Sequence, residues 1–275
     1  MYSTEHKIRT RLYLTLLVWI SVQPAGASDS SENKRIHPEH SLLYPMPSEP
    51  NLWNLGGTAR FLHRYLNLVP KESLVAGVAW NGVPVDYCNW ELNIWFSINS
   101  HTYHAADGWA LFYTVEPITN VELDYRKTTM GGPNDYNGIA LIYDSFDNSY
   151  LPDGYFPRIY PVLLDGSYKQ VHSDNGVWQR RHSCFYPCGN TNCKVLFRYK
   201  NRQLYMKAMN WRGEWRCDWT EENVVLPAGG YFSFTAFNDK YYFIYHETVD
   251  IREFKVEEIL DGNECFERDG QKPKW

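Results

Sequence analysis

The chain has 275 residues and a formal net charge of −5, from 27 Lys plus Arg against 32 Asp plus Glu. This charge excludes a polybasic nucleic-acid-binding protein, and contents of 44% hydrophobic and 16% aromatic residues exclude a disordered chain. The 18 glycines and 15 prolines follow no period, which excludes collagen-like and low-complexity classes.

Residues 1–27 have the features of a secretory signal peptide. They comprise the basic residues Lys7, Arg9 and Arg11, the apolar run Leu12–Val22, and the small residues Ala25-Gly26-Ala27. The apolar run is far shorter than the about 20 residues that a membrane-spanning helix needs. We therefore expect cleavage, no transmembrane segment in the mature chain, and a protein of the secretory pathway (ER-Golgi lumen) or a secreted one. In that compartment, the six cysteines are expected to form disulfides.

Residues 28–50 form a polar stretch that contains four prolines and no periodic pattern. Because prolines and polar residues without periodicity are typical of irregular backbone, we predict a flexible lead-in here.

From Trp53 onward the hydrophobic pattern has period two. The clearest case is residues 90–98, where Trp90, Leu92, Ile94, Phe96 and Ile98 alternate with mostly polar residues. Further strands are predicted at 108–114, 138–145, 157–164, 194–199, 204–210, 230–237 and 249–256, separated by turn dipeptides such as Asn81-Gly82 and Asp153-Gly154. The sequence therefore predicts an all-β domain over residues 51–260, an antiparallel β-sandwich or jelly roll, followed by a tail at 261–275.

One predicted strand ends in a loop with oxygen-bearing groups at alternate positions. Asp144 offers a carboxylate, Phe146 a backbone carbonyl and Asn148 an amide oxygen, and a hard cation such as calcium accepts such a set. From these residues alone, a surface turn is the simpler interpretation, since Asp and Asn are common in turns.

Two more polar residues stand beside apolar strands. Asp107 precedes the run Gly108–Tyr113 and could be a strand-start turn or a residue at the mouth of a pocket. His172 lies just before the polar turn Asp174-Asn175-Gly176. A single histidine is usually a surface or core group, so its interest depends on the fold bringing it to the other loops.

Several short motifs occur together in one order. They are Asn89-Trp90-Glu91-Leu92, Ala106-Asp107-Gly108-Trp109-Ala110, Asn137-Gly138-Ile139-Ala140 running into Asp144–Asn148, His172 with Asn175-Gly176, the pair Cys184 and Cys217, and Leu226-Pro227-Ala228-Gly229-Gly230-Tyr231-Phe232. From Trp53 to Glu257, this order resembles the L-type, legume-like lectins, the mannose-binding cargo receptors that cycle between endoplasmic reticulum and Golgi.

The resemblance implies a concanavalin-like jelly roll that binds Ca2+ and the mannose of high-mannose glycans. On matching positions, Asp144, the Phe146 carbonyl and Asn148 would bind calcium, and Asp107, Asn148 and His172 would contact sugar hydroxyls. It also implies a disulfide between Cys184 and Cys217. With that pair taken, we expect Cys188 to pair with Cys193 and Cys88 with Cys265.

Two positions depart from the family pattern. Where the family has a further calcium-binding Asp, this chain has Asn175, preceded by Asp174, so that either residue could complete the calcium site. The Gly-Gly segment whose amides contact mannose is replaced by Asn238–Tyr245, an aromatic run that does not offer glycine's close backbone approach.

We considered three alternatives to a lectin. A glycoside hydrolase of this architecture is disfavoured, because no strand carries the needed set of catalytic carboxylates, and we expect no enzyme. A zinc site formed by His182, Cys184, Cys188 and Cys193 is disfavoured by the oxidising compartment. A lectin-fold protein that has lost sugar binding and acts on a protein partner stays open beside the main prediction, a lectin for mannose-type glycans of glycoproteins.

Overall fold

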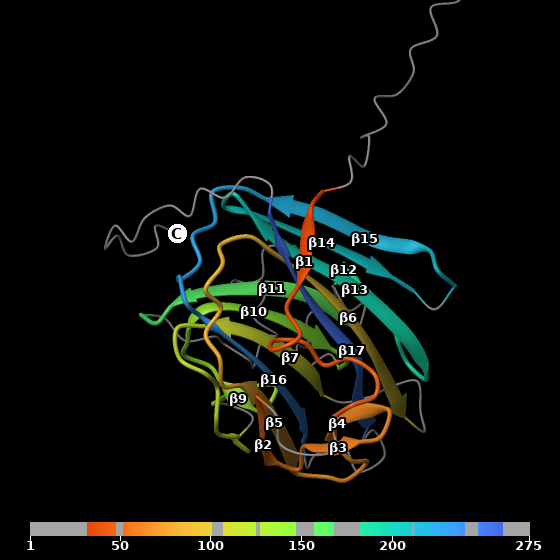
Figure 1. Cartoon of the computed structure of the whole chain (residues 1–275). Coiled ribbons are helices and arrows are strands. Elements are labelled where there is room, and N and C mark those ends of the chain that lie inside the picture. Colours follow the sequence, from red (N-terminus) through yellow and green to blue (C-terminus); the bar gives the residue numbers. More distant parts are fainter. Residues whose placement is uncertain are drawn as a thin grey trace, which may run out of the picture. The chain divides into compact units, whose positions relative to one another are not determined.

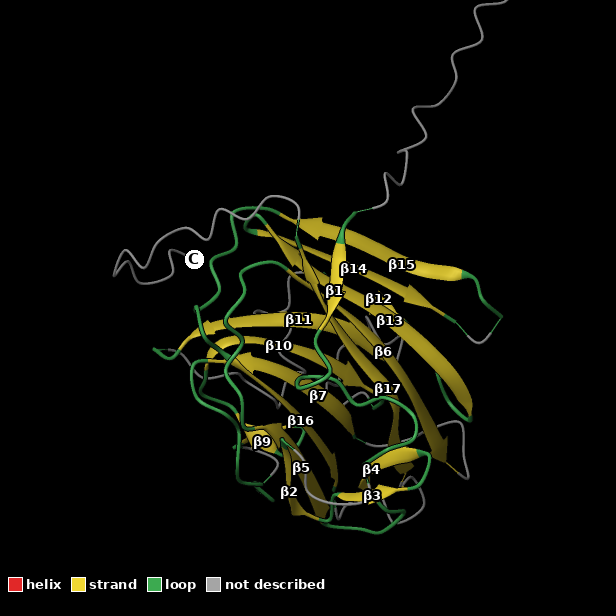
Figure 2. Cartoon of the chain, viewed as in Figure 1, coloured by secondary structure: helices red, strands yellow, loops and turns green. Residues whose placement is uncertain are grey.

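The structure, a computed structural model, describes residues 32–47, 52–100, 107–124, 127–146, 157–167, 182–210, 212–239 and 247–260. These residues form two antiparallel sheets that pack face to face, and Figures 1 and 2 show only strands and loops among them. The predicted all-β class and the antiparallel sandwich are confirmed.

One sheet has eight strands. Its order is β15 (Trp215–Glu221), β14 (Gln203–Met209), β13 (Thr191–Lys200), β6 (Trp90–Ser100), β17 (Glu247–Ile259), β4 (Tyr65–Val69) and β3 (Arg60–Leu62), and β1 (Lys34–Ile36) also pairs with β17.

The other sheet has seven strands. Its order is β12 (Cys184–Phe185), β11 (Arg158–Asp165), β10 (Asn137–Asp144), β7 (Gly108–Thr114), β16 (Tyr231–Asn238), β5 (Val75–Asn81) and β2 (Trp53–Gly57), and a small separate pair is formed by β8 (Thr128–Thr129) and β9 (Gly132–Pro133).

The core between the sheets is aromatic. The alternating apolar residues of β6 all face it, as period two predicts. The rings of Phe96 on β6 and Trp109 on β7 meet across the sandwich edge to face, with centroids 4.8 Å apart. Strand β7 is buried along its whole length because Ala110 and Phe112 pack on its other face in a second core with Tyr136 and Ile142.

Eight strands, among them the central strands of both sheets, lie where the period-two pattern predicts them. The predicted segment 108–114 matches β7, and 138–145 matches β10 to within one residue. Strands β2 to β5 and the edge strands β12 and β15 were not predicted; β12 is only two residues long, too short to show a period, whereas β15 does alternate and was missed.

The N-terminal segment corrects one prediction. Residues 34–46 lie within the predicted flexible lead-in, yet Lys34–Ile36 form β1 on β17, and Leu42 and Met46 are buried in the main core. The backbone of Leu42 exchanges hydrogen bonds of 2.7 and 2.9 Å with Phe254. Burial of these apolar side chains holds a segment whose prolines conceal any period.

The described cysteines are all in disulfides. Cys184 on β12 bonds to Cys217 on β15, the predicted pair, and so joins the edge strands of the two sheets. Cys188 bonds to Cys193, also as predicted, and the sulfur ligands of the alternative zinc site are therefore consumed. Cys88 is disulfide-bonded as well, while its predicted partner Cys265 lies outside the described residues.

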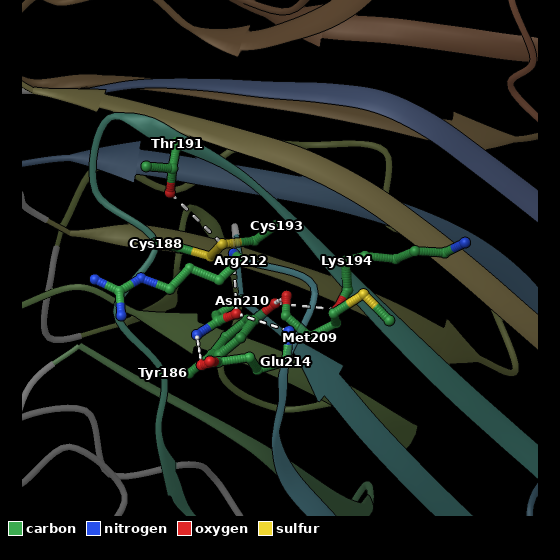
Figure 3. The surroundings of a disulfide bond; sticks show 9 residues. All are labelled: Tyr186, Cys188, Thr191, Cys193, Lys194, Met209, Asn210, Arg212 and Glu214. Carbon is green, nitrogen blue, oxygen red and sulfur yellow. Dashed lines mark hydrogen bonds between the residues drawn. A yellow bond between two sulfur atoms is a disulfide. The ribbon is translucent and has the colours of Figure 1, made fainter.

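The surroundings of the Cys188–Cys193 bond are shown in Figure 3. The Tyr186 hydroxyl lies within hydrogen-bond distance of the carbonyl oxygens of Lys194 (3.0 Å) and Met209 (2.6 Å), which lie on neighbouring strands. The Asn210 side-chain oxygen accepts from the backbone amides of the turn that follows β14. The disulfide thus ties the loop before β13 to β13 itself, beside contacts that involve β13 and β14 of the eight-stranded sheet.

Candidate functional site

The register of three neighbouring strands gathers acidic residues at one end of the seven-stranded sheet. Gly108, the first residue of β7, lies opposite Asp144 at the end of β10 and opposite Phe237 near the end of β16. Because the strands are antiparallel, the loop before β7 meets the loops after β10 and β16. Asp107, Asp144 and Asp239 are therefore neighbours, although the sequence separates them by many residues.

Glycine at 108 allows this close approach. Its φ is +136°, a conformation that L side chains rarely adopt, and a Cβ there would lie 2.0 Å from the Tyr143 carbonyl oxygen. Any larger residue would push β7 away from β10 and displace Asp107 from the other acidic residues.

Asp107 is held firmly and lies deeper than a residue at a pocket mouth. It is 1% exposed, and its Oδ2 accepts a 2.7 Å hydrogen bond from the backbone amide of Asp239. Its own backbone donates to the Phe237 carbonyl (3.1 Å) and accepts from the Ser145 amide (2.9 Å). An exposed strand-start turn therefore does not describe Asp107. Its place at a sugar pocket stays a prediction, since Asn148 and His172 lie outside the described residues.

Asp144 fixes the start of the predicted calcium loop. Its Oδ1 accepts a 3.3 Å hydrogen bond from the Phe146 amide, and its Oδ2 accepts one of 3.1 Å from the Tyr160 hydroxyl. The side chain is fully buried. An exposed surface turn, the simpler interpretation of this sequence, does not describe Asp144.

A third buried carboxyl group, that of Glu247, comes from the other sheet. Glu247 is the first residue of β17 and is 0% exposed. Within the described part of the chain, neither of its carboxylate oxygens has a hydrogen-bond partner, although the Ser145 hydroxyl lies nearby. Burial raises the pKa of Glu247 well above its ordinary value, and the charges of Asp107 and Asp144 add to this effect.

The same electrostatic situation affects Asp107. Burial raises the pKa of Asp107 to about 7, the hydrogen bond from Asp239 opposes this rise, and the charge of Asp239 adds to it. Within the described part of the chain, neither Asp107 nor Glu247 forms an ion pair with a lysine or arginine. Buried like charges without a compensating cation are unfavourable when ionised.

A divalent cation fits this donor set. Calcium binds carboxylate and backbone carbonyl oxygens, and the end of β10 offers the Asp144 carboxylate and the Phe146 carbonyl. A cation at this end of the sheet would also neutralise the acidic groups that burial leaves uncompensated. This fit concerns the described residues only.

The predicted site residues divide into two groups. The structure brings Asp107, Asp144 and Phe146 together at one end of the sheet. Asn148, His172, Asp174 and Asn175 lie outside the described residues, as does the aromatic run from Tyr241 to Tyr245, and their roles stay predictions.

Two residues of this site were not anticipated. The backbone amide of Asp239 donates a hydrogen bond to Asp107, and Glu247 is buried close to Asp107 and Asp144. A pattern search offers little signal for Glu247, because an acidic residue at the start of a strand normally indicates a solvated turn. Its burial depends on which strand of the other sheet lies behind β7.

The sequence profile described as "Legume-like lectin family" matches residues 33–263. Vesicular integral-membrane protein VIP36 of dog (Canis lupus familiaris) is 27% identical over 237 residues, or 82% of this chain and 64% of that protein. Protein ERGIC-53 of mouse (Mus musculus) is 25% identical over 222 residues, or 77% of this chain and 41% of that protein. The chain thus spans less than two-thirds of the length of these two relatives.

Solved structures show the same fold. The exoplasmic/lumenal domain of VIP36 bound to Ca2+ and Man3GlcNAc matches with a TM-score of 0.77 at 24% identity, covering 87% of this chain and 98% of that one. The legume lectin-like domain from Entamoeba histolytica matches with a TM-score of 0.63 at 16% identity, covering 82% and 99%. Among the described residues, no helix is long and apolar enough to cross a membrane.

Proposed function

The chain belongs to the legume-like lectin family, and we propose that it is a calcium-assisted lectin for mannose-type N-glycans of glycoproteins in the secretory pathway. The observation that carries this proposal is the cluster of Asp107, Asp144 and Glu247, three buried acidic side chains beside loops from adjacent strands. The solved VIP36 domain with calcium and Man3GlcNAc bound supports the ligand class.

In this proposal the loop after β10 holds the calcium ion. Asp144 and the Phe146 carbonyl bind it together with Asn148, and Asn175 or Asp174 completes the shell. The bound ion supplies positive charge and keeps the loop in one geometry. The hydrogen bond from Tyr160 to Asp144 and the buried position of Asp144 orient the first ligand before the ion arrives.

Asp107 is the proposed sugar-binding carboxylate. Of the two carboxylate oxygens of Asp107, only Oδ2 accepts a hydrogen bond from a described residue. This bond comes from the Asp239 backbone amide and fixes the orientation of the carboxylate. Oδ1 is the atom that we assign to a mannose hydroxyl. Calcium nearby favours the ionised form of Asp107, which is the better hydrogen-bond acceptor. Asn148 and His172 are the proposed further contacts.

We propose binding without catalysis. A retaining or inverting glycosidase needs an acid and a second carboxylate flanking a solvent-accessible sugar. Here Asp144 and Glu247 are fully buried, and they serve better as a cation-binding support than as groups that touch a glycosidic bond.

A second function has one specific observation in its favour. The amide that follows β16 donates to Asp107 rather than standing free for a sugar, and the family's Gly-Gly segment is replaced by Asn238–Tyr245. A lectin-fold protein that has lost sugar binding and recognises a protein through this segment would show this arrangement.

A glycan array read with calcium and with a chelator separates the two functions. The proposal expects binding to mannose-type glycans in calcium only, and loss of that binding in Asp107→Asn. The control is Asp218→Asn, which changes an exposed aspartate on β15. Calcium-independent binding or no glycan binding by the folded parent would contradict the proposal, and the latter result would favour the protein-binding function.

The signal peptide at 1–27, the tail at 261–275 and the location in the ER-Golgi lumen or outside the cell belong to the same proposal. Both segments lie outside the described residues. Sequencing of the N-terminus of secreted protein tests the first.

A further inference from the structure

A second group of polar side chains follows β1, in the segment that was predicted to be flexible. One ring nitrogen from each of His37 and His40 and a carboxylate oxygen of Glu39 lie within 4.8 Å of one another. His37 and His40 are buried, at 9% and 1% exposure, whereas the Glu39 side chain is 39% exposed. Two imidazoles and one carboxylate are typical ligands of zinc.

The orientation of His40 follows from Asn81, the last residue of β5. The Asn81 amide nitrogen donates to the Glu39 carbonyl (2.7 Å), and its oxygen accepts from the Val83 amide (2.9 Å). These two contacts decide which atom of the Asn81 side-chain amide is the oxygen and which is the nitrogen. The oxygen faces Nδ1 of His40 at 3.3 Å, so Nδ1 carries the proton.

The other nitrogen of His40 is then the one with a lone pair. A histidine that donates through one nitrogen to a fixed oxygen and offers the other is arranged as zinc-binding histidines usually are.

His37 is arranged in the same way with its two nitrogens exchanged: Nε2 faces a fixed oxygen, and Nδ1 faces the proposed site. Its Nε2 lies 3.0 Å from Oε2 of Glu258 on β17, and its Nδ1 lies 2.7 Å from Oε1 of Glu39. One proton satisfies the contact with Glu258. The contact with Glu39 then brings together a nitrogen and a carboxylate oxygen, a pair that either a second proton or a metal ion can join.

The surroundings add one more feature. The Tyr87 ring lies against His37 and meets His40 edge to face, with centroids 4.1 and 5.6 Å apart. The Tyr87 hydroxyl is buried, and no described residue gives it a hydrogen bond. A water molecule on a metal ion beside these rings would offer such a hydroxyl a partner.

We propose that His37, Glu39 and His40 form a zinc site, with Nδ1 of His37, Nε2 of His40 and the Glu39 carboxylate as ligands and water in the fourth position. The hydrogen bonds from His37 to Glu258 and from His40 to Asn81 orient the two imidazoles. Glu258 lies on β17 and Asn81 on β5, so that an ion bound to His37 and His40 would hold the N-terminal segment against both sheets. The site is separate from the carboxyl cluster at the end of β7.

Isothermal titration with zinc chloride tests the site, on the mature chain without a histidine tag and with saturating calcium present to occupy the other cluster. We expect one zinc ion per chain and a rise in melting temperature on zinc addition. Glu39→Gln keeps the shape of a partly exposed side chain and should weaken zinc binding about tenfold or more. Glu72→Gln, at an exposed position, is the control and should bind as the parent does.

A second variant, His37→Gln, should weaken binding to a similar extent, with folding checked by circular dichroism. If His37→Gln does not fold, the Glu39→Gln result decides. No zinc binding by the parent at millimolar concentration, or parental affinity in Glu39→Gln, would overturn the proposal. Unchanged zinc binding in Asp107→Asn confirms that the ion is not at the carboxyl cluster.

Discussion

Two sets of buried carboxyl groups, Glu91 on one sheet and Asp107 with Glu247 at the end of the other, differ in how their charge is compensated. On the eight-stranded sheet, the Glu91 carboxylate, 3% exposed, accepts from Lys34 at 2.9 Å and from Nε of Arg198 at 2.7 Å. At the end of the seven-stranded sheet, Asp107 and Glu247 are as deeply buried and form no ion pair within the described residues.

The pKa of Glu91 and the pKa values of Asp107 and Glu247 are shifted in opposite directions, in line with this difference in charge compensation. Burial alone would raise the pKa of Glu91, but the hydrogen bond from Lys34 and the charge and hydrogen bond of Arg198 outweigh it, and the pKa is lowered. The pKa values of Asp107 and Glu247 are raised by burial. A buried carboxylate with its own cations is a structural element, whereas one without them costs stability unless a cation arrives from solution. Among the described residues, Asp107 and Glu247 are of the second kind, and they lie at the end of the sheet where loops meet.

Glu91→Gln is expected to have the largest effect. It leaves Lys34 and Arg198 beside a neutral amide, although Arg198 keeps a second partner, Glu32, at 3.1 Å. Removing one member of a buried ion pair costs about 3 kcal/mol or more of the free energy of unfolding. Urea unfolding measures this loss, with Glu222→Gln at an exposed position as the control. If Glu91→Gln unfolds with the same free energy as the parent, the two sets of buried carboxyl groups do not differ as described.

Asp107→Asn should change ligand binding more than folding. The charge-assisted hydrogen bond to a sugar hydroxyl is worth about 1.5 to 3 kcal/mol, which corresponds to about tenfold or more in affinity. The amide oxygen can still accept from the Asp239 amide, so the fold should persist. Calorimetry with a high-mannose oligosaccharide measures the affinity, and a variant that binds like its parent would show that Asp107 is not in the sugar site.

Acid should remove the contribution of Glu91. Because its pKa is lowered in the folded state, the stability it supplies is present above its ordinary pKa of 4.5 and is lost as the pH falls through the folded value. The stability difference between the parent and Glu91→Gln should therefore shrink in strongly acidic buffer. Urea unfolding at neutral and acidic pH measures it, and a difference that grows in acid would contradict the ion-pair explanation.

Glu247→Gln is expected to have the smallest effect on the calcium-free protein. The substitution keeps the side-chain volume and removes a buried group whose ionised form repels Asp107 and Asp144. Thermal unfolding in chelator should show a stability equal to the parent's or above it, the opposite of Glu91→Gln. A large loss of stability would mean that Glu247 has a cationic partner after all.

The sequence predicts the strands that frame the site better than the site itself. Period two locates β6, β7 and β10 because their apolar residues face one continuous core. The resemblance identifies Asp107 and Asp144, but their burial depends on strand register, which places Gly108 opposite both neighbouring strands. Glu247 could not be predicted, since its partners come from another sheet.

The N-terminal segment shows a similar limit. Four prolines and polar residues indicate irregular backbone, and the backbone of 37–47 is indeed mostly irregular. It is nevertheless held in place by Leu42 and Met46 in the core and by His37 against Glu258. Order that arises from a few long-range contacts has no local period, and so a pattern search does not detect it.

Calorimetric titration of calcium into the metal-free protein tests the central claim most directly. The claim is that the carboxyl cluster at the end of β7 and β10, which no described lysine or arginine pairs with, serves a bound calcium ion. We expect a binding isotherm at millimolar concentration or below in the parent, and a weakened one in Asp144→Asn. Heat no larger than dilution in the parent, or full binding in Asp144→Asn, would contradict it.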